Sequence, residues 1–267
     1  HGTAVGGFEA SERSEGAFDQ AYEFATAHVS HVGVDLPIPV GFWRAVGHSH
    51  QAFFKESFLD ECAQTAMRAL HAQHLDHLTP ADSFTQSVNY RAALLAQHPR
   101  HKAVLDLAVT KHGTAEQGKK PTTTLGVALH ESFGSIVAMV AEVSITADKE
   151  IRVHKITAAV DCGFCVNPAG VAAQVESSVA FGLSAALWGK VDFVDGKVQQ
   201  SNFHNYRVLR MNEMPLVETH IVPSRRAPEG MGEPALPPVA PAVANALFAL
   251  TGQRLRSLPL TLATIAA

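Results

Sequence analysis

One carboxylate in this sequence stands where it could take part in catalysis. Glu233 lies in the segment 230–234, Gly-Met-Gly-Glu-Pro, directly ahead of a proline-rich turn and a predicted helix. Glycine lets a backbone approach a ligand closely, and proline restricts where the neighbouring carboxylate can point. A partly buried carboxylate held in this way can serve as a general base. On spacing alone, a solvated loop acid or a helix-entry residue is the commoner outcome for such a glutamate.

An arginine in a second segment could supply positive charge to the same chemistry. Arg44 follows Trp43 and precedes His48 in a short glycine-bounded stretch. A buried guanidinium can donate to a carbonyl oxygen or a ring substituent and stabilise negative charge that develops there. A surface arginine stacked on an aromatic ring explains the pattern of residues equally simply.

Two further sets of side chains have spacings that metal or redox sites use. Cys162 and Cys165 form a Cys-x-x-Cys, which fits a redox pair or half of a zinc site, but no second such pair completes a tetrahedral site. The histidines at 71, 74 and 77 recur every three residues, a spacing that a polar helix face also produces. We therefore assign no metal ligand and favour a packing role for the cysteines.

The apolar periodicity predicts helices on either side of these segments. The longest predicted helix carries apolar residues at every fourth position and should turn that stripe to the core. The helix after Asn167 begins with proline, runs through small residues to Trp188 and should be closely packed and buried. The stripe consists of Phe54, Phe58, Cys62, Ala66 and Leu70, and the predicted helices cover 54–70, 90–97, 99–111, 168–188 and 239–250.

Strands are predicted in pairs joined by short turns, with loops elsewhere. Because strand pairs alternate with long helices and do not form regular βαβ units, the predicted fold class is α+β. The β-branched runs 136–145 and 151–160 should form an antiparallel hairpin, and Asp195-Gly196 should turn a second one. Further expectations are a strand over 216–222, an exposed loop over 114–124, an extended stretch over 28–40 and a connecting segment over 1–33.

Composition excludes several classes of function. The 267 residues are 46% hydrophobic and 17% charged, which suits a well-buried chain that packs against partners. This length fits either one large domain or two closely packed lobes. A formal charge of −4 leaves no broad basic face for nucleic acid. The apolar runs are interrupted, so we expect no membrane-spanning stretch. No glycine-rich phosphate loop is found, and no secretion signal is visible at His1, which we interpret as a processing or cleavage boundary.

Several segments, in the same order along the chain, resemble the molybdopterin-binding subunits of the xanthine dehydrogenase and aldehyde oxidase family, in particular the isoquinoline 1-oxidoreductase beta-subunit branch. Segment 230–246 is similar to the family's Gly-Glu-Pro signature. Segment 161–168, continuing to Gln174 and Glu176, is similar to its Asp-x-Gly-x-x-x-Asn-Pro motif and the helix that follows. Segments 41–53, 126–135 and 201–207 also look like this branch.

This resemblance implies that residues 34–267 are the C-terminal part of a molybdopterin cofactor-binding domain, with helices packed on antiparallel or mixed sheets. It implies oxidative hydroxylation of an aldehyde or an N-heterocycle, with water as the oxygen source. Glu233 would be the catalytic base, and Arg44 would orient the substrate or stabilise charge. Gln174 and Gly232 would contact the pterin of the molybdenum cofactor.

The sequence also departs from the family pattern. The Gly-Gln-Gly and Gly-Gly-Phe-Gly segments and the cysteine patterns of iron–sulfur clusters are absent, so we expect the cofactor to be shared with another chain or a missing segment. Ser177-Ser178 replaces a common Gly-Gly pair. Expected partners are the remaining part of the molybdopterin subunit and an iron–sulfur subunit, with a cytochrome c subunit as a candidate acceptor.

Two expectations follow from the branch and from the missing segments. Exported enzymes are frequent in this branch, so we expect a periplasmic location, with the cytoplasm as the alternative. A non-catalytic structural subunit or fragment of such a complex remains the competing interpretation.

Overall fold

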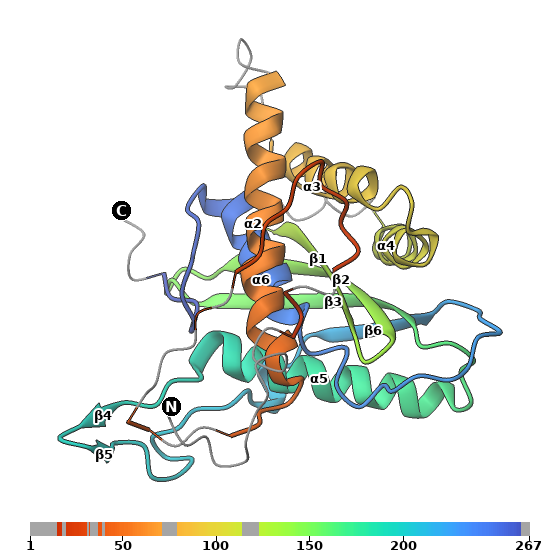
Figure 1. Ribbon diagram of the computed structural model, residues 1–267. Coiled ribbons are helices and arrows are strands. Elements are labelled where there is room, and N and C mark those ends of the chain that lie inside the picture. Colours follow the sequence, from red (N-terminus) through yellow and green to blue (C-terminus); the bar gives the residue numbers. More distant parts are fainter. Residues whose placement is uncertain are drawn as a thin grey trace.

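A four-stranded mixed sheet forms the centre of the fold (Figure 1). In the sheet, β1 (Thr124–Ser132), β2 (Ser135–Ile145) and β3 (Ile151–Asp161) run antiparallel in sequence order, and β6 (Leu216–Ile221) pairs parallel with β3. The predicted α+β class and the predicted hairpin are therefore confirmed. The computed structural model describes residues 15–17, 20–30, 32, 37–38, 41–70, 79–113 and 123–262.

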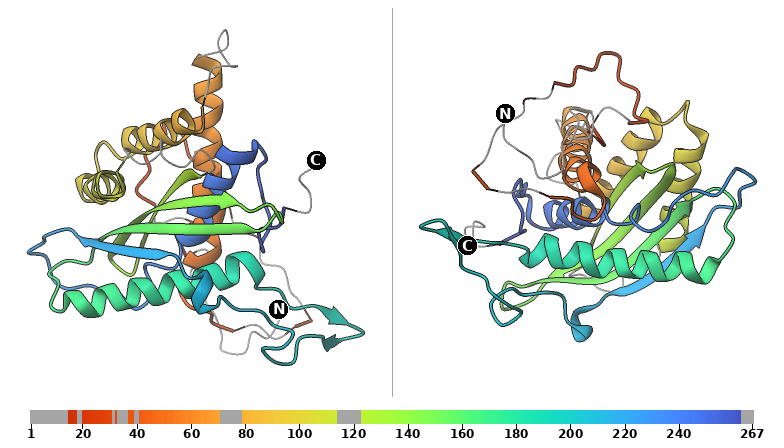
Figure 2. Two further views of the ribbon diagram at one scale, coloured as in Figure 1. Left: turned by 180° about the vertical axis from the view of Figure 1, so that it is seen from behind. Right: turned by 60° about the horizontal axis from the view of Figure 1, so that its bottom comes forward.

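Helices cover both faces of this sheet (Figure 2). They are α2 (Val46–Leu70), α3 (Pro80–Leu94), α4 (Pro99–His112), α5 (Pro168–Trp188) and α6 (Val239–Thr251). One apolar cluster joins α5 and α6 to residues of β2 and β3 such as Met139 and Ile156, and a second joins α3 and α4 to the opposite face through Ile136 and Val140. The longest helix, α2, packs against α6, α3 and the edge strand β1.

Local capping explains several helix ends. Asn167 accepts from the Gly170 N–H at the start of α5, and α6 ends at Gly252, which adopts a left-handed conformation. α3 begins at Pro80, well before the predicted start at Tyr90, because Thr79 and Asp82 form a capping box. The capping box lies in a Thr-Pro-x-Asp sequence that a search for apolar periodicity passes over.

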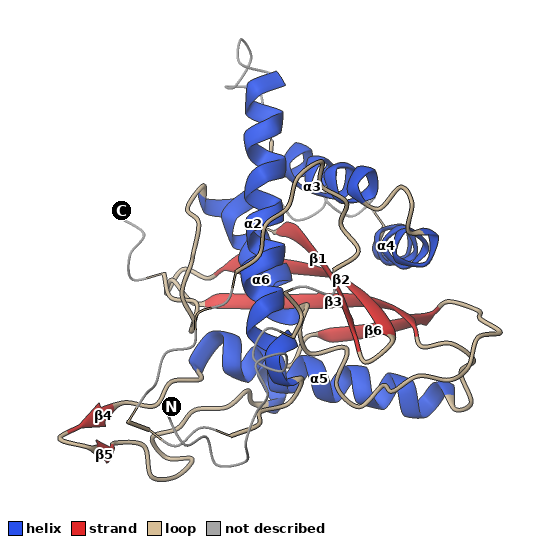
Figure 3. Cartoon of the chain, in the orientation of Figure 1, coloured by secondary structure: helices blue, strands red, loops and turns tan. Residues whose placement is uncertain are grey.

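The second hairpin is short. The structure confirms its Asp195-Gly196 turn, with both residues at positive φ, between β4 (Phe193–Val194) and β5 (Lys197–Val198). Figure 3 shows loop between β5 and β6, apart from the short 3₁₀ helix η2 (Met211–Glu213).

The prediction for the buried face of α2 was wrong. Phe54 and Phe58 are 56% and 60% exposed, and Leu70 is 78% exposed. The buried face instead carries Glu56 and Asp60 among its apolar residues. Buried carboxylates are tolerated when each is paired and hydrogen-bonded, and those partners come from other elements.

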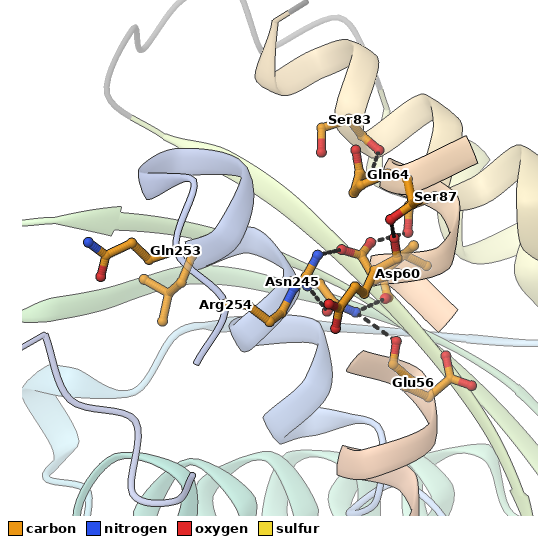
Figure 4. A network of polar contacts seen from close by, with 12 residues as sticks. Glu56, Asp60, Gln64, Ser83, Ser87, Asn245, Gln253 and Arg254 are labelled. Carbon is orange, nitrogen blue, oxygen red and sulfur yellow. Dashed lines mark hydrogen bonds and ion pairs between the residues drawn. The ribbon is translucent and has the colours of Figure 1, made fainter. Parts of the chain in front are cut away.

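A buried polar network joins α2 to α3, β1 and α6 (Figure 4). Arg91 Nε lies 2.9 Å from Glu56 Oε2, and both side chains are fully buried. Asp60 accepts from the Ser87 hydroxyl and lies 2.8 Å from Arg254 NH2. These contacts neutralise the charges on α2 and fix the helix against the sheet.

α5 is less buried than its composition suggested. Judged by length and composition alone, it is long and apolar enough to cross a membrane. This contradicts the expectation that the chain has no stretch of that length and composition. Only 33% of its most apolar window is buried. Its exposed residues include Gln174, Ser177 and Phe181, so this helix presents a side-chain surface to whatever lies beside it.

The N-terminal expectations are only partly covered by the described residues. Within the predicted connecting segment, Tyr22 is buried at 5% exposure and Glu23 N–H donates to Leu94 O, so this part is anchored to α3. The histidines at 71, 74 and 77 and most of the predicted loop 114–124 lie outside the described residues.

Candidate active site

Three segments that are far apart in sequence meet at Arg44. Its Nε donates to Gly232 O at 2.9 Å, and NH2 also contacts this oxygen. NH1 donates to Ser177 Oγ and NH2 to Gln174 Oε1, each at 3.0 Å. The loop before α2, the exposed face of α5 and the loop before α6 are thereby joined. Arg44, Gln174, Gly232 and the adjoining Glu233, which the resemblance implicated together, do lie together.

The residue after Arg44 holds the Glu233 carboxylate. Ala45 N–H donates to Glu233 Oε1 at 3.3 Å, and Ala45 is fully buried. Ala45 and Val46 have φ of 70° and 47°, a left-handed conformation that is costly for non-glycine residues, above all for a β-branched one. Strain of about 1–3 kcal/mol per residue is typical of functional sites, where surrounding contacts enforce the conformation.

The loop that carries Glu233 is fixed at several points before it reaches that residue. Ser135 Oγ donates to Gly230 O at 2.8 Å. Glu229 N–H donates to Cys162 O at 2.9 Å, and Phe164 N–H to Arg226 O at 3.0 Å. Residues 226–230 are therefore held along the turn after β3, and this fixes the point from which the loop reaches Glu233.

Gly163 makes this close approach possible. It has φ +70°, and a Cβ there would lie 2.0 Å from Ala227 O, so no other residue fits. Asp161 accepts from Gly163 N–H at 3.0 Å and pairs with Arg100 Nε at 2.7 Å. Burial would raise the pKa of Asp161, but the hydrogen bonds from Arg100 and Gly163 outweigh it and lower the pKa.

The charge of Arg44 is set by two opposed effects. Burial lowers the pKa of the guanidinium, and the Glu233 carboxylate opposes that shift. An arginine remains protonated under all ordinary conditions, so the site keeps one cation beside one partly buried carboxylate. A carboxylate placed next to a reacting group can serve as a general base.

The surroundings of Gly232 fit a polar organic cofactor. A Cβ at Gly232 would meet no atom of the described residues within 4 Å, so protein packing does not account for this glycine. Its exposed backbone lies beside the Gln174 amide and the Arg44 guanidinium, which supply both donors and acceptors of the kind a pterin ring recognises.

Two buried histidines support the start of α2. His48 Nδ1 lies 2.9 Å from His130 Nε2 on β1, and Phe133 packs edge-on against His48. Burial, followed by the charges of Lys55 and His48, lowers the pKa of His130 well below its usual value. The sequence resembled the family over 126–135 without indicating this pair.

The described residues give no support to the metal or thiol-redox alternatives at Cys162 and Cys165. Among residues 15–262 that the structure describes, no group of three or more His, Cys, Asp or Glu side chains is arranged to hold a metal ion. Cys162 and Cys165 are free, and burial raises the pKa of Cys162, which disfavours its reactive thiolate form.

Comparison with known proteins decides the family. Residues 60–215 match the family described as "Molybdopterin cofactor-binding domain". The chain belongs to this family. The resemblance to the isoquinoline 1-oxidoreductase branch is also confirmed, because the chain is 31% identical over 245 residues to isoquinoline 1-oxidoreductase subunit beta of Brevundimonas diminuta, covering 90% of this chain and 29% of that protein.

A further curated relative and one solved structure are similar to this chain over part of their own lengths. A membrane-bound aldehyde dehydrogenase (pyrroloquinoline-quinone) of Gluconacetobacter polyoxogenes is 28% identical over 90% of this chain and 32% of its own length. Quinoline 2-oxidoreductase from Pseudomonas putida 86 has a TM-score of 0.45 and 23% identity over 48% of this chain and 17% of that chain. The chain thus spans about a third of the first two relatives' length, and Arg44 and Glu233 lie outside the matched family residues.

Proposed function

We propose that this molybdopterin-binding domain is part of a molybdenum hydroxylase in which Glu233 is the catalytic base. The observation that carries the proposal is the pair of hydrogen bonds to Gly232 and Glu233. Arg44 holds the carbonyl of one residue while Ala45 N–H holds the carboxylate of the next. Arg44 and Ala45 are adjacent, and Ala45 is buried with a φ of 70°, a costly conformation that persists only where surrounding contacts enforce it.

Each residue of the site would have one task. When bound, the molybdenum cofactor supplies the two-electron oxidation of the substrate. Gln174 and the bare backbone at Gly232 would hold its pterin. Glu233 would accept the proton of the water-derived oxygen nucleophile, and Ala45 N–H would keep its carboxylate turned toward the reacting atoms. Arg44 would keep Gly232 in place.

The substrate class and the partners follow from the same assignment. Aldehydes and N-heterocycles both offer an electron-poor carbon that a base-activated oxygen can attack, and names of both kinds occur among the relatives. The electrons would pass to iron–sulfur clusters on a partner chain and then to an acceptor such as a cytochrome c subunit. The remaining part of the molybdopterin subunit would complete the cofactor site in a hetero-oligomer, and we propose a periplasmic location for it.

The test uses the protein purified together with its associated polypeptides. Molybdenum is measured per chain, and turnover is run in ¹⁸O-water with an aldehyde and with an N-heterocycle. Stoichiometric molybdenum and ¹⁸O in the product are expected. An intact assembly that contains no molybdenum would instead support the non-catalytic structural subunit.

A further inference from the structure

Ser177 stands beside Arg44 on a surface of α5 that is built to receive the loop before α2. Gln174, Ser177 and Phe181 are spaced at i, i+3 and i+7, so they share one face of the helix. Trp43 stacks on Phe181 with ring centroids 5.1 Å apart, and the Arg44 guanidinium lies 5.9 Å from the same ring. The face therefore contacts two successive residues of the loop.

The contacts on the Arg44 guanidinium leave it little freedom. A guanidinium has five N–H donors, and its Nε, one donor of NH1 and both donors of NH2 are engaged with Gly232, Ser177 and Gln174. Ser177 is the only described partner of NH1. Without it, NH1 would lose this restraint on the guanidinium.

The three α5 side chains restrain Arg44 to different degrees. The Phe181 ring attracts a cation without fixing its direction. The Gln174 amide is carried on a long, flexible chain and, under the proposed function, also serves the pterin. The Ser177 hydroxyl is one rotatable bond from the helix backbone, and its 3.0 Å contact is with a charged donor, which makes it a comparatively strong hydrogen bond. The glycine common at this position in the resembling family would offer no acceptor.

We propose that Ser177 is a positioning residue for Glu233. It fixes the plane of Arg44, the guanidinium in turn fixes Gly232 O, and Ala45 N–H then meets the Glu233 carboxylate. The consequence for turnover rests on the proposed role of Glu233 as the base. The expected loosening of the loop that holds Trp43 does not depend on that role.

Loss of the hydroxyl should loosen the loop and misdirect the carboxylate. We expect Ser177→Ala to lower kcat by about tenfold, since small displacements of a catalytic group have effects of this order, and to leave KM nearly unchanged because Ser177 does not reach the substrate.

The experiment compares three substitutions in the intact, cofactor-loaded protein. Trp43 and Trp188 are the only tryptophans of this chain, so in a Trp188→Phe background the Trp43 signal is the difference between the assembly and its Trp43→Phe counterpart. Ser177→Ala should increase quenching of Trp43 by acrylamide, and Ser177→Thr, which keeps a hydroxyl, should restore the wild-type signal and kcat. The matched control is Ser178→Ala, because the Ser178 hydroxyl is buried and has no hydrogen-bond partner among the described residues.

Three results would count against the proposed assignments in distinguishable ways. Equal Trp43 quenching in Ser177→Ala and Ser178→Ala would overturn the proposal. Altered quenching with unchanged kcat would also overturn it. Near-normal turnover of a loaded Glu233→Gln protein would instead overturn Glu233 as the base, while leaving the Trp43 result intact.

Discussion

Removal of the Glu56 carboxylate should destabilise the fold severely. In Glu56→Ala, Arg91 loses the acceptor of its Nε, and Leu129 N–H on β1 loses the oxygen that lies 3.0 Å away. Arg91 is fully buried, and although burial lowers the pKa of its guanidinium, Glu56 and its other acidic neighbours raise it more. An arginine keeps its proton even without this partner, and an uncompensated buried charge costs about 3–5 kcal/mol.

Urea unfolding of the full chain, followed by circular dichroism, measures this loss. Glu56→Gln keeps a side-chain acceptor and should lose less. Glu61→Ala is the matched control, because it removes the ion pair between exposed Arg256 and Glu61 on the same helix and should leave the urea midpoint almost unchanged. If Glu56→Ala and Glu61→Ala unfolded at the same urea concentration, the network would not stabilise the fold in the way described.

Three further outcomes are expected. Arg44→Lys, which lacks the planar fork, should lower kcat by a similar factor of about 10 to 100 for every substrate, whereas a loss confined to one substrate would place Arg44 at the substrate instead. Because the folded pKa of His130 is depressed, its contribution to stability is complete above an unfolded pKa of about 6.5 and is lost as the pH falls below it. His130→Gln should therefore flatten the decline of the melting temperature between about pH 7.5 and pH 5.5, each value measured by calorimetry, and an unchanged decline would contradict this. Gly163→Ala should reduce thermal stability more than Gly196→Ala, because both glycines have positive φ but only the first would clash, at Ala227 O; equal losses would contradict the close approach.

Part of the fold could be predicted because its signals are local. The hairpin of β2 and β3, helix α4 and the Asp195-Gly196 turn each follow from residues adjacent in sequence. The buried face of α2 could not be predicted, because Glu56 and Asp60 become acceptable in a core only through Arg91 and Arg254, which come from distant parts of the chain. Apolar periodicity alone therefore selected the exposed face.

The candidate site divides in the same way. Resemblance to the family brought Arg44, Gln174, Gly232 and Glu233 to attention, and the structure places them together. It could not indicate Ala45, whose role depends on a left-handed backbone and a single N–H. Strand β1 was also missed, because its polar residues His130 and Glu131 interrupt the apolar pattern and find their partners only in the folded chain.

The most direct test of the central claim is the reductive half-reaction of Glu233→Gln in the assembled protein. The amide keeps the shape and can still accept from Ala45 N–H, but it cannot take the proton, so the rate should fall by about 10²–10⁴-fold. Molybdenum content and subunit composition are measured on the same sample, since lost cofactor would imitate lost chemistry. A fully loaded, intact Glu233→Gln assembly that reduces at a near-normal rate would contradict the assignment of Glu233 as the base.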